Sequence, residues 1–153
     1  MSSFTVAMIQ ARPPRDRDEA AEVGQDWCRR AAVHGADLAL FPELWDCGYR
    51  FPAPGDAAAV AAWRAGALAP EAAFLATFRR LAHELGMAIA LTYLAKGAHG
   101  PRNVVTLIDR QVNDALTYAK VHTCEFGAES LLSPGDGFPV AQLDTAAGQV
   151  KIG

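Results

Sequence analysis

The sequence contains little that would place the protein outside the cell or in a membrane. Only three of its 153 residues are cysteines, and Cys28, Cys47 and Cys124 are too few and too scattered for a disulfide framework. The first residues lack the basic segment and long apolar core of a secretory signal, and no apolar run approaches the ~20 residues of a membrane span. We therefore expect reduced thiols, a cytoplasmic location and no membrane partner.

A large excess of one charge and the common nucleotide-binding motifs are also lacking. The 14 Lys and Arg residues oppose 17 Asp and Glu residues, so no basic surface predicts a nucleic-acid partner. The patterns G-x-G-x-x-G, G-x-x-x-x-G-K-[ST] and G-x-S-x-G are absent, which argues against dinucleotide-binding, P-loop and α/β-hydrolase classes. With 51% apolar and 20% charged residues, the chain suits one compact globular domain.

What the sequence does contain is an alternation of strand-like and helix-like segments. An apolar run at 4–10, a helical pattern at 16–34 and a second apolar run at 36–41 give a β-α-β order, typical of helices packed on a sheet. Further helices are expected at 57–67 and from Pro70-Glu71 to Leu85, where Gly86 ends the helix. Further strands are expected at 87–94, 103–109, 115–121, 139–143 and 149–152, with 110–114 short enough for a hairpin.

The first candidate for chemistry is a carboxylate in the irregular stretch 43–55, a loop long enough to suggest a function. Glu43 directly follows the C-terminal end of a buried strand, where α/β sheets place their ligand crevices. Aromatic neighbours such as Trp45 and Tyr49 would partly remove this carboxylate from water, a setting typical of a general base. The alternative is an exposed loop glutamate, or one that caps the next turn.

The second candidate is a lysine near the end of a predicted strand. Lys120 is the only lysine between Lys96 and Lys151, and strand alternation could direct it into the same crevice. There it could stabilise an oxyanion or pair with a carboxylate. Taken alone, however, the pattern favours a solvated lysine on an edge strand.

The loop that follows holds a third group of candidates: His122, Cys124, Glu125 and Glu129. A histidine and a cysteine two residues apart supply only two ligands, so we expect no metal site here. A Cys–His pair needs only hydrogen-bond reach to create a nucleophile, so Cys124 beside His122 remains an open alternative.

These segments carry a resemblance to a known family. The stretch Phe-Pro-Glu-Leu-Trp-Asp-Cys-Gly-Tyr at 41–49 resembles the first catalytic motif of the carbon–nitrogen hydrolase (nitrilase) superfamily, with Glu43 at the general base. The stretch Tyr-Ala-Lys-Val-His-Thr-Cys-Glu-Phe at 118–126 is similar to its second motif, with Lys120 at the catalytic lysine. Asn103 in an Arg-Asn-Val-Val strand and the Ser-Pro-Gly-Asp-Gly loop at 133–137 agree with the family's order of elements.

The resemblance implies a fold and indicates which part of the family's domain the chain would form. We expect an α/β protein, a partial α-β-β-α sandwich of the nitrilase type with a mixed sheet and two main helices on one face. Residues 1–153 would form the N-terminal portion of a single carbon–nitrogen hydrolase domain, with the C-terminal part absent. The nucleophilic cysteine of the third motif would lie shortly beyond Gly153, since no cysteine of this sequence occupies its position.

The resemblance also implies an activity. Hydrolysis of an amide-type carbon–nitrogen bond would use a Glu-Lys-Cys set, with Glu129 as a second, orienting glutamate and Glu125 as its competitor. Trp45 and Tyr49 become candidates for the substrate pocket. The substrate would be a small amide or nitrile, with no metal or organic cofactor, and the full-length enzyme would be a homo-oligomer. The chain on its own would then be inactive.

Two alternatives stay open. The chain could be a non-catalytic truncated remnant that acts at most as a binding or interaction module. It would then leave the strand at 149–152 and one face of the sheet uncovered, so it should associate or aggregate. Alternatively, an active chain could use Cys124 as the nucleophile, with His122 or Lys120 as its partner.

Overall fold

The computed structural model describes residues 3–124, 126–146 and 148–153, and its centre is a five-stranded mixed sheet. The strands run in the order β1-β2-β3-β4-β5 across the sheet, and the first three are parallel while the last two pairings are antiparallel. Their bounds are β1 Val6–Met8, β2 Leu38–Leu40, β3 Ala88–Ala95, β4 Arg102–Ile108 and β5 Asp114–Ala119. The predicted β-α-β order and mixed sheet are confirmed.

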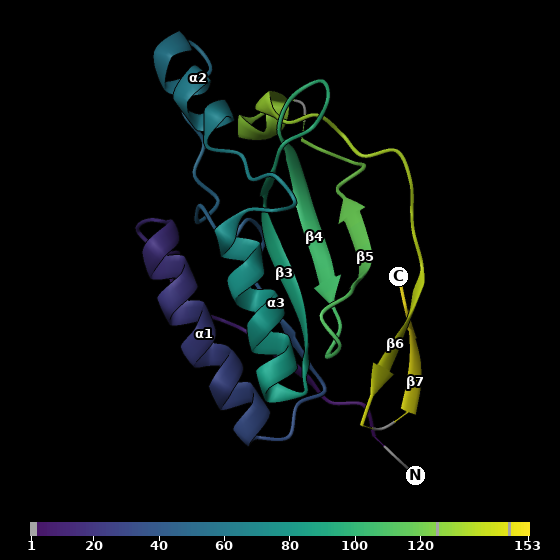
Figure 1. Cartoon of the computed structure of the whole chain (residues 1–153). Coiled ribbons are helices and arrows are strands. Elements are labelled where there is room, and N and C mark those ends of the chain that lie inside the picture. The colour runs from purple at the N-terminus through teal and green to yellow at the C-terminus, as the bar shows by residue number, and fades with distance from the viewer. Residues whose placement is uncertain (1–2, 125, 147) are drawn as a thin grey trace.

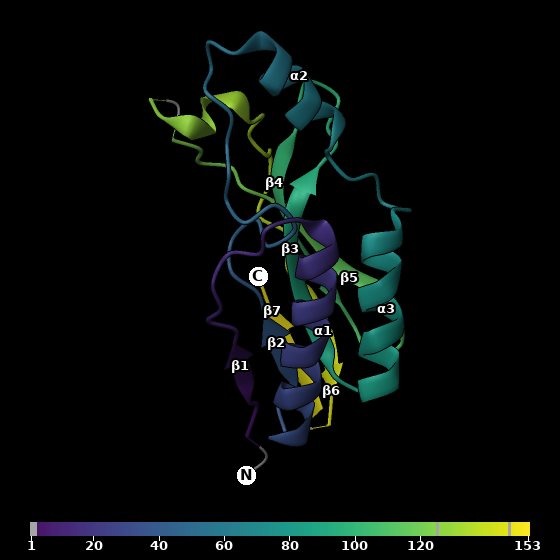
Figure 2. The same cartoon turned by 90° about the vertical axis from the view of Figure 1, so that its left-hand side faces the viewer.

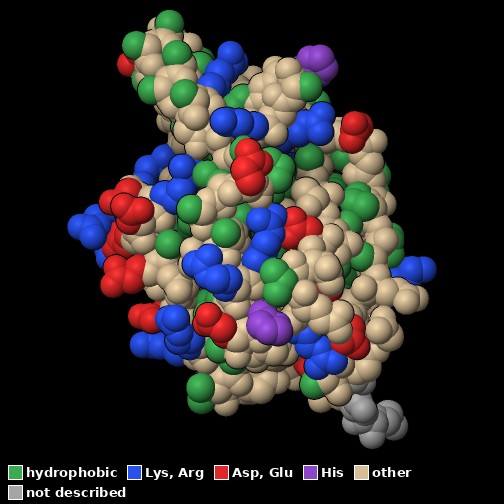
Figure 3. Space-filling model, viewed as in Figure 1, with side chains coloured by type: hydrophobic (Ala, Val, Ile, Leu, Met, Phe, Trp, Pro, Cys, Tyr) green, Lys and Arg blue, Asp and Glu red, His purple; other side chains and the backbone are tan. Residues whose placement is uncertain are grey.

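Two helices, α1 (Arg17–Val33) and α3 (Ala73–Leu85), lie side by side on one face of this sheet (Figures 1 and 2). Their apolar faces are buried against the strands in one cluster that includes Cys28, Phe78 and Ile89. The outer side of α1 carries charged side chains of both signs (Figure 3). This is the amphipathic pattern that the sequence predicts for a helix packed on a sheet.

The start of α3 differs from the prediction. The helix begins at Ala73, because residues 69–72 form a turn in which Ala72 N donates to Ala69 O and Ala72 has extended backbone angles. Its end agrees with the prediction, since Gly86 adopts a left-handed φ of 60° just after Leu85. Pro70 therefore precedes the helix as part of a turn.

Helix α2 (Ala57–Ala65) lies beyond the end of the sheet and has no buried residue (Figure 1). The Asp56 carboxylate accepts a hydrogen bond from Ala59 N and caps its first turn. The helix ends at Ala65, two residues before the predicted limit, with Gly66 as its C-cap, and Leu68 then forms a parallel bridge with Ala95 at the end of β3. None of the described helices is long and apolar enough to cross a membrane.

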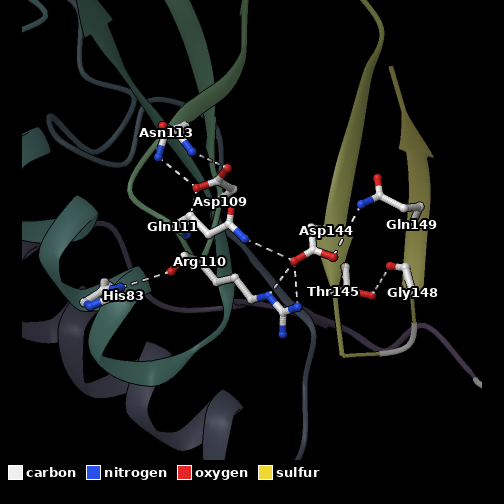
Figure 4. Close-up of polar contacts among 9 residues, drawn as sticks. All are labelled: His83, Asp109, Arg110, Gln111, Asn113, Asp144, Thr145, Gly148 and Gln149. Carbon is white, nitrogen blue, oxygen red and sulfur yellow. Dashed lines mark hydrogen bonds and ion pairs between the residues drawn. The ribbon is translucent and has the colours of Figure 1, made fainter.

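The opposite face of the sheet carries a hairpin of β6 (Ala141–Thr145) and β7 (Gly148–Ile152). Leu143 of β6 is fully buried against this face. At the same end, Arg110 donates from Nε (3.0 Å) and Nη2 (2.6 Å) to Asp144 Oδ2, so an ion pair joins the β4–β5 turn to the hairpin (Figure 4). Strand β6 begins two residues later than predicted, because the hairpin pairs Ala141 with Ile152 and leaves residues 139–140 exposed.

Candidate functional site

The loop after β2 is attached to β3 by a threonine. Thr92, buried on β3, donates its hydroxyl hydrogen to Pro42 O and accepts a hydrogen bond from Trp45 N (3.2 Å). The two residues that Thr92 contacts, Pro42 and Trp45, lie on either side of Glu43 in the sequence. The backbone around this carboxylate is therefore fixed relative to the sheet. The loop therefore presents Glu43 at the C-terminal edge of β2, where the sequence predicts a ligand crevice.

A buried aspartate makes the second attachment of this loop. Asp46 is 1% exposed, accepts from Leu94 N at 2.8 Å and from Arg17 Nη2 at 2.9 Å, and so joins the loop to β3 and to α1. Burial raises the pKa of Asp46, while its hydrogen bonds with Arg17 and Leu94 oppose that rise. The loop is thus held on both sides of Glu43 by buried polar contacts.

The same loop turns tightly through residues in left-handed conformations. Leu44 has a φ of 50°, Gly48 of 68° and Tyr49 of 56°, and only glycine adopts such angles without steric cost. The backbone amides of Cys47, Gly48 and Tyr49 all donate to Leu44 O, which closes the turn. Strained non-glycine residues of this kind cluster at functional sites.

A lysine joins two carboxylates at the centre of the site. Lys120 follows β5 directly, and its Nζ lies 2.8 Å from Glu43 Oε1 and 2.8 Å from Glu129 Oε1. Asn103 Nδ2 donates to the same Glu43 Oε1 at 2.6 Å. In the described part of the chain, nothing hydrogen-bonds Glu43 Oε2, and this side chain is 44% exposed. One oxygen of Glu43 is therefore occupied and the other is open.

Glu129 lies in the short 3₁₀ helix η1 (Ala128–Leu131) and is only 2% exposed. Besides Lys120 Nζ, its carboxylate accepts from Tyr49 OH (2.8 Å) at Oε1 and from Cys124 N (2.8 Å) at Oε2. Three donors around one buried carboxylate fix its orientation. Glu129 thus connects the loop after β2 to the loop after β5.

These contacts stabilise the charged forms of the cluster. Burial raises the pKa of Glu129, but hydrogen bonds from Lys120, Cys124 N and Tyr49 outweigh it and hold that pKa below its usual range. Burial likewise lowers the pKa of Lys120, and the two carboxylates outweigh it and raise that pKa above its ordinary value. Its hydrogen bond to Glu129 raises the pKa of Tyr49 to about 12, so the phenol keeps its proton.

A cavity of about 440 Å³ opens beside the cluster and is lined by Glu43, Asn103, Lys120 and Tyr118, among others. A smaller one of about 260 Å³ is also lined by Glu43, together with Trp45 and Tyr49. Glu43 therefore borders two spaces that a small molecule could enter. The arrangement can hold a base, a fixed positive charge and a small polar ligand together.

The carbon–nitrogen hydrolase family model matches residues 5–153. The chain belongs to the carbon–nitrogen hydrolase family. The chain is 31% identical over 102 residues to an aliphatic nitrilase of Sinorhizobium fredii (strain HH103), an alignment that covers 60% of this chain and 33% of the nitrilase.

Solved structures of the superfamily have the same fold as this chain. An amidase from Nesterenkonia sp. matches with a TM-score of 0.68 and 25% identity over 99% of this chain and 55% of the amidase. The protein XC1258 of Xanthomonas campestris matches with a TM-score of 0.76 and 19% identity over 99% of this chain and 52% of its own. Other structures of the Nesterenkonia amidase contain butyramide, or acrylamide added at its active-site cysteine. The chain spans about half the length of these solved relatives.

The predicted family and α/β sandwich fold are therefore confirmed, and three of the predicted site residues lie together. Glu43, Lys120 and Glu129 meet through direct contacts although they come from different loops. Glu125, the competitor for the second glutamate, lies outside the described residues. In the part that is described, no group of three His, Cys, Asp or Glu side chains could hold a metal ion.

The two aromatic pocket candidates have different environments. Trp45 is 1% exposed, its Nε1 donates to Ala20 O at 2.8 Å, and it packs against Phe41, so most of its surface belongs to the core. Tyr49 is half-exposed, with its hydroxyl donating to Glu129. Both line the smaller cavity beside Glu43, and their contact with substrate stays a prediction.

The cysteines of the described chain divide into two kinds. Cys28 is buried and Cys47 is partly buried, and burial raises the pKa of each thiol to about 12. Cys124 is exposed, and its backbone amide is the group that contacts Glu129. Among the described residues no hydrogen bond joins Cys124 to His122, whose ring lies 6.2 Å from that of Phe138.

Three polar residues of the site carried no functional assignment from the sequence. Thr92 and Asp46 hold the loop, and Asn103, noted only as a landmark of the family's order, contacts Glu43 directly. For Thr92 and Asn103 the one available indication was a polar residue within a predicted buried strand, since such residues need a hydrogen-bond partner; for Asp46, in the predicted loop, there was none.

Proposed function

We propose that this carbon–nitrogen hydrolase contributes the base, the lysine and the orienting glutamate for hydrolysis of a small amide-type substrate. The cysteine nucleophile would come from polypeptide beyond the residues of this chain. The observation that carries the proposal is the position of Lys120 Nζ, 2.8 Å from Glu43 Oε1 and 2.8 Å from Glu129 Oε1. A lysine held between two carboxylates at a cavity is an arrangement expected of a catalytic site rather than of a solvated surface.

The open oxygen of Glu43 suits it to move protons. Its Oε2 would take the proton of the attacking thiol, and the sulfur would form a bond to the amide carbon. Collapse of the tetrahedral intermediate breaks the carbon–nitrogen bond, and Glu43 returns the proton to the departing nitrogen. Water then attacks the thioester with Glu43 again as the base, which releases the acid and restores the thiol.

Lys120 would stabilise the negative charge that develops on the substrate oxygen. Its ammonium keeps its proton, because both neighbouring carboxylates favour the charged form. One preorganised donor of this kind is worth roughly 3–4 kcal/mol of transition-state stabilisation. Glu129 is less suited to carry protons, since three donors already occupy its two oxygens, and it serves to orient Lys120.

The relatives support a small amide or nitrile as the substrate. One is an aliphatic nitrilase, and structures of the Nesterenkonia amidase contain butyramide or acrylamide. A cavity of about 440 Å³ beside Glu43 and Lys120 is large enough for a molecule of that size. Within this proposal, residues 1–153 form the N-terminal portion of one catalytic domain, are inactive alone and work in a homo-oligomer in the cytoplasm.

A binding module without catalysis is the second candidate. It is favoured by apolar side chains left exposed around the sheet and the C-terminal hairpin, such as Met8 (71%), Phe138 (70%) and Val140 (57%). The 153-residue chain would then associate without any hydrolysis, whichever cysteine-bearing segment is supplied.

The proposal is tested by turnover of short aliphatic amides and nitriles in a polypeptide that joins this chain to its cysteine-bearing segment. Glu43→Gln and Lys120→Ala should each lower kcat by about 100-fold or more, because each removes a group that acts in the transition state. Thr106→Val is a matched control, since this buried β4 hydroxyl bonds Tyr93 and Thr117 rather than the cluster. Near-wild-type turnover in either site variant would refute the assignment.

A further inference from the structure

Asn103 contacts both groups to which the proposed function assigns chemistry. It is the second residue of β4 and is only 6% exposed. Its side-chain Nδ2 donates to Glu43 Oε1 at 2.6 Å, and its backbone carbonyl accepts from Lys120 N at 2.8 Å. One residue of the sheet therefore fixes the side chain of the base and the backbone of the lysine.

The position of Asn103 follows from the strand pairing. Asn103 lies opposite Leu94 of β3, and Leu94 N is the donor that holds Asp46. The ends of β3 and β4 thus hold the loop after β2 at two points, on Asp46 and on Glu43. A buried amide of this kind must find a partner, and the Glu43 carboxylate is the one that its Nδ2 finds.

The two donors on Glu43 Oε1 differ in what they can determine. The Lys120 ammonium is a compact point charge on a flexible stem, so it attracts the carboxylate without selecting one of its oxygens. The Asn103 amide is planar and comes from a rigid strand, so it binds one oxygen in one direction. Without it, the carboxylate could rotate and turn both oxygens toward Lys120.

We propose that Asn103 is a positioning residue that holds Glu43 Oε1 and thereby keeps Oε2 open to receive the thiol proton. This inference rests on the proposed function of Glu43 as the base. It concerns the orientation of the carboxylate and leaves substrate binding to other groups.

The test replaces Asn103 by leucine, which has a similar size and no donor, in the polypeptide that includes the cysteine-bearing segment. A misdirected base should lower kcat on the order of 100-fold. The KM for a short amide should change little, because the substrate contacts are retained. Thr106→Val, on the same strand and equally buried, should keep the wild-type kcat.

A second readout uses the 153-residue chain labelled with ¹⁵N. The side-chain amide signals of Asn103 should shift in Glu43→Ala, and those of the other asparagine, Asn113, should not. Asn113 Nδ2 donates to Asp109 at the far end of β4, so it serves as an internal reference. Unshifted Asn103 signals would overturn the inference without any assay of activity.

The outcomes separate the inference from the proposed function. If Glu43→Gln is inactive while Asn103→Leu keeps the wild-type kcat, Asn103 is not a positioning residue and the proposed function stands. If Glu43→Gln is active, the proposed function fails, and the inference fails with it. If Asn103→Leu does not fold, Asn103→Ala removes the donor without adding bulk or charge beside Glu43. Wild-type kcat in that variant would equally overturn the inference.

Discussion

The buried carboxylate of Glu129 offers a prediction that the 153-residue chain can test alone. In Glu129→Gln the side chain keeps its shape and loses its charge. The glutamine oxygen can still accept from Lys120 and Tyr49, which share Oε1 in the wild type. In the wild type, Cys124 N donates to Glu129 Oε2 at 2.8 Å. In the variant, the side-chain amide of the glutamine takes the place of Oε2, so two donors face each other. The substitution thus removes one charge-assisted bond and weakens two.

The expected cost follows from these contacts. A hydrogen bond to a charged group contributes about 1.5–3 kcal/mol, and a buried donor left unpaired costs about 1–3 kcal/mol. Because Lys120 keeps Glu43 as a partner, we expect the free energy of unfolding to fall by about 2–4 kcal/mol. Urea unfolding followed by far-ultraviolet circular dichroism measures this difference, and Glu84→Gln on the exposed side of α3 is a control that should stay within about 0.5 kcal/mol of wild type.

The same variant predicts a pH dependence. The folded state lowers the pKa of Glu129, so its stabilising effect is present above the unfolded value of about 4.3 and is lost as the pH falls through the folded value. The difference in stability between wild type and Glu129→Gln should therefore be largest near neutral pH and shrink in acid. A difference below about 0.5 kcal/mol at neutral pH, or one that does not change in acid, would refute the account of this carboxylate.

Two further predictions concern packing and thiol reactivity. Gly24→Ala should lower the free energy of unfolding by about 1–3 kcal/mol in the same urea assay, because a Cβ at this position would lie 2.8 Å from the Phe78 ring. An unchanged free energy of unfolding would contradict the close approach of α1 and α3. Iodoacetamide should modify the exposed Cys124 first in the folded chain, since burial raises the pKa of Cys28 and Cys47 to about 12. Peptide mass spectrometry that finds Cys28 or Cys47 modified as fast would contradict this.

The sequence predicts the order of elements well, because each depends on local patterns. The helical pattern at 16–34 becomes α1, and Gly86 ends α3 where a left-handed residue is needed. Boundaries that depend on tertiary contacts shift instead. Ala141 starts β6 because of its pairing with Ile152, and α2 ends at Ala65, shortly before the chain reaches the bridge of Leu68 to Ala95 of β3.

In the candidate site, too, features that depend on local patterns are predicted and features that depend on tertiary contacts are not. Glu43 and Lys120 lie in recognisable motifs, so the sequence predicts them together with their proposed roles. The contact of Asn103 with Glu43 depends on the register of β4 beside β3 and β5, a long-range property that no local pattern contains. The left-handed backbone conformations of Leu44 and Tyr49 cannot be predicted from the sequence either, because neither residue type favours that conformation.

The central claim is that one lysine and one open carboxylate act on a thiol brought from elsewhere in the polypeptide. It is tested most directly by the rate of a single turnover, in which rapid quenching and intact mass detect acyl transfer from a short amide to the cysteine. We expect the acyl adduct to form in the wild type and to form about 100-fold or more slowly in folded Glu43→Gln and Lys120→Ala. Acylation at the wild-type rate in either variant would contradict the claim.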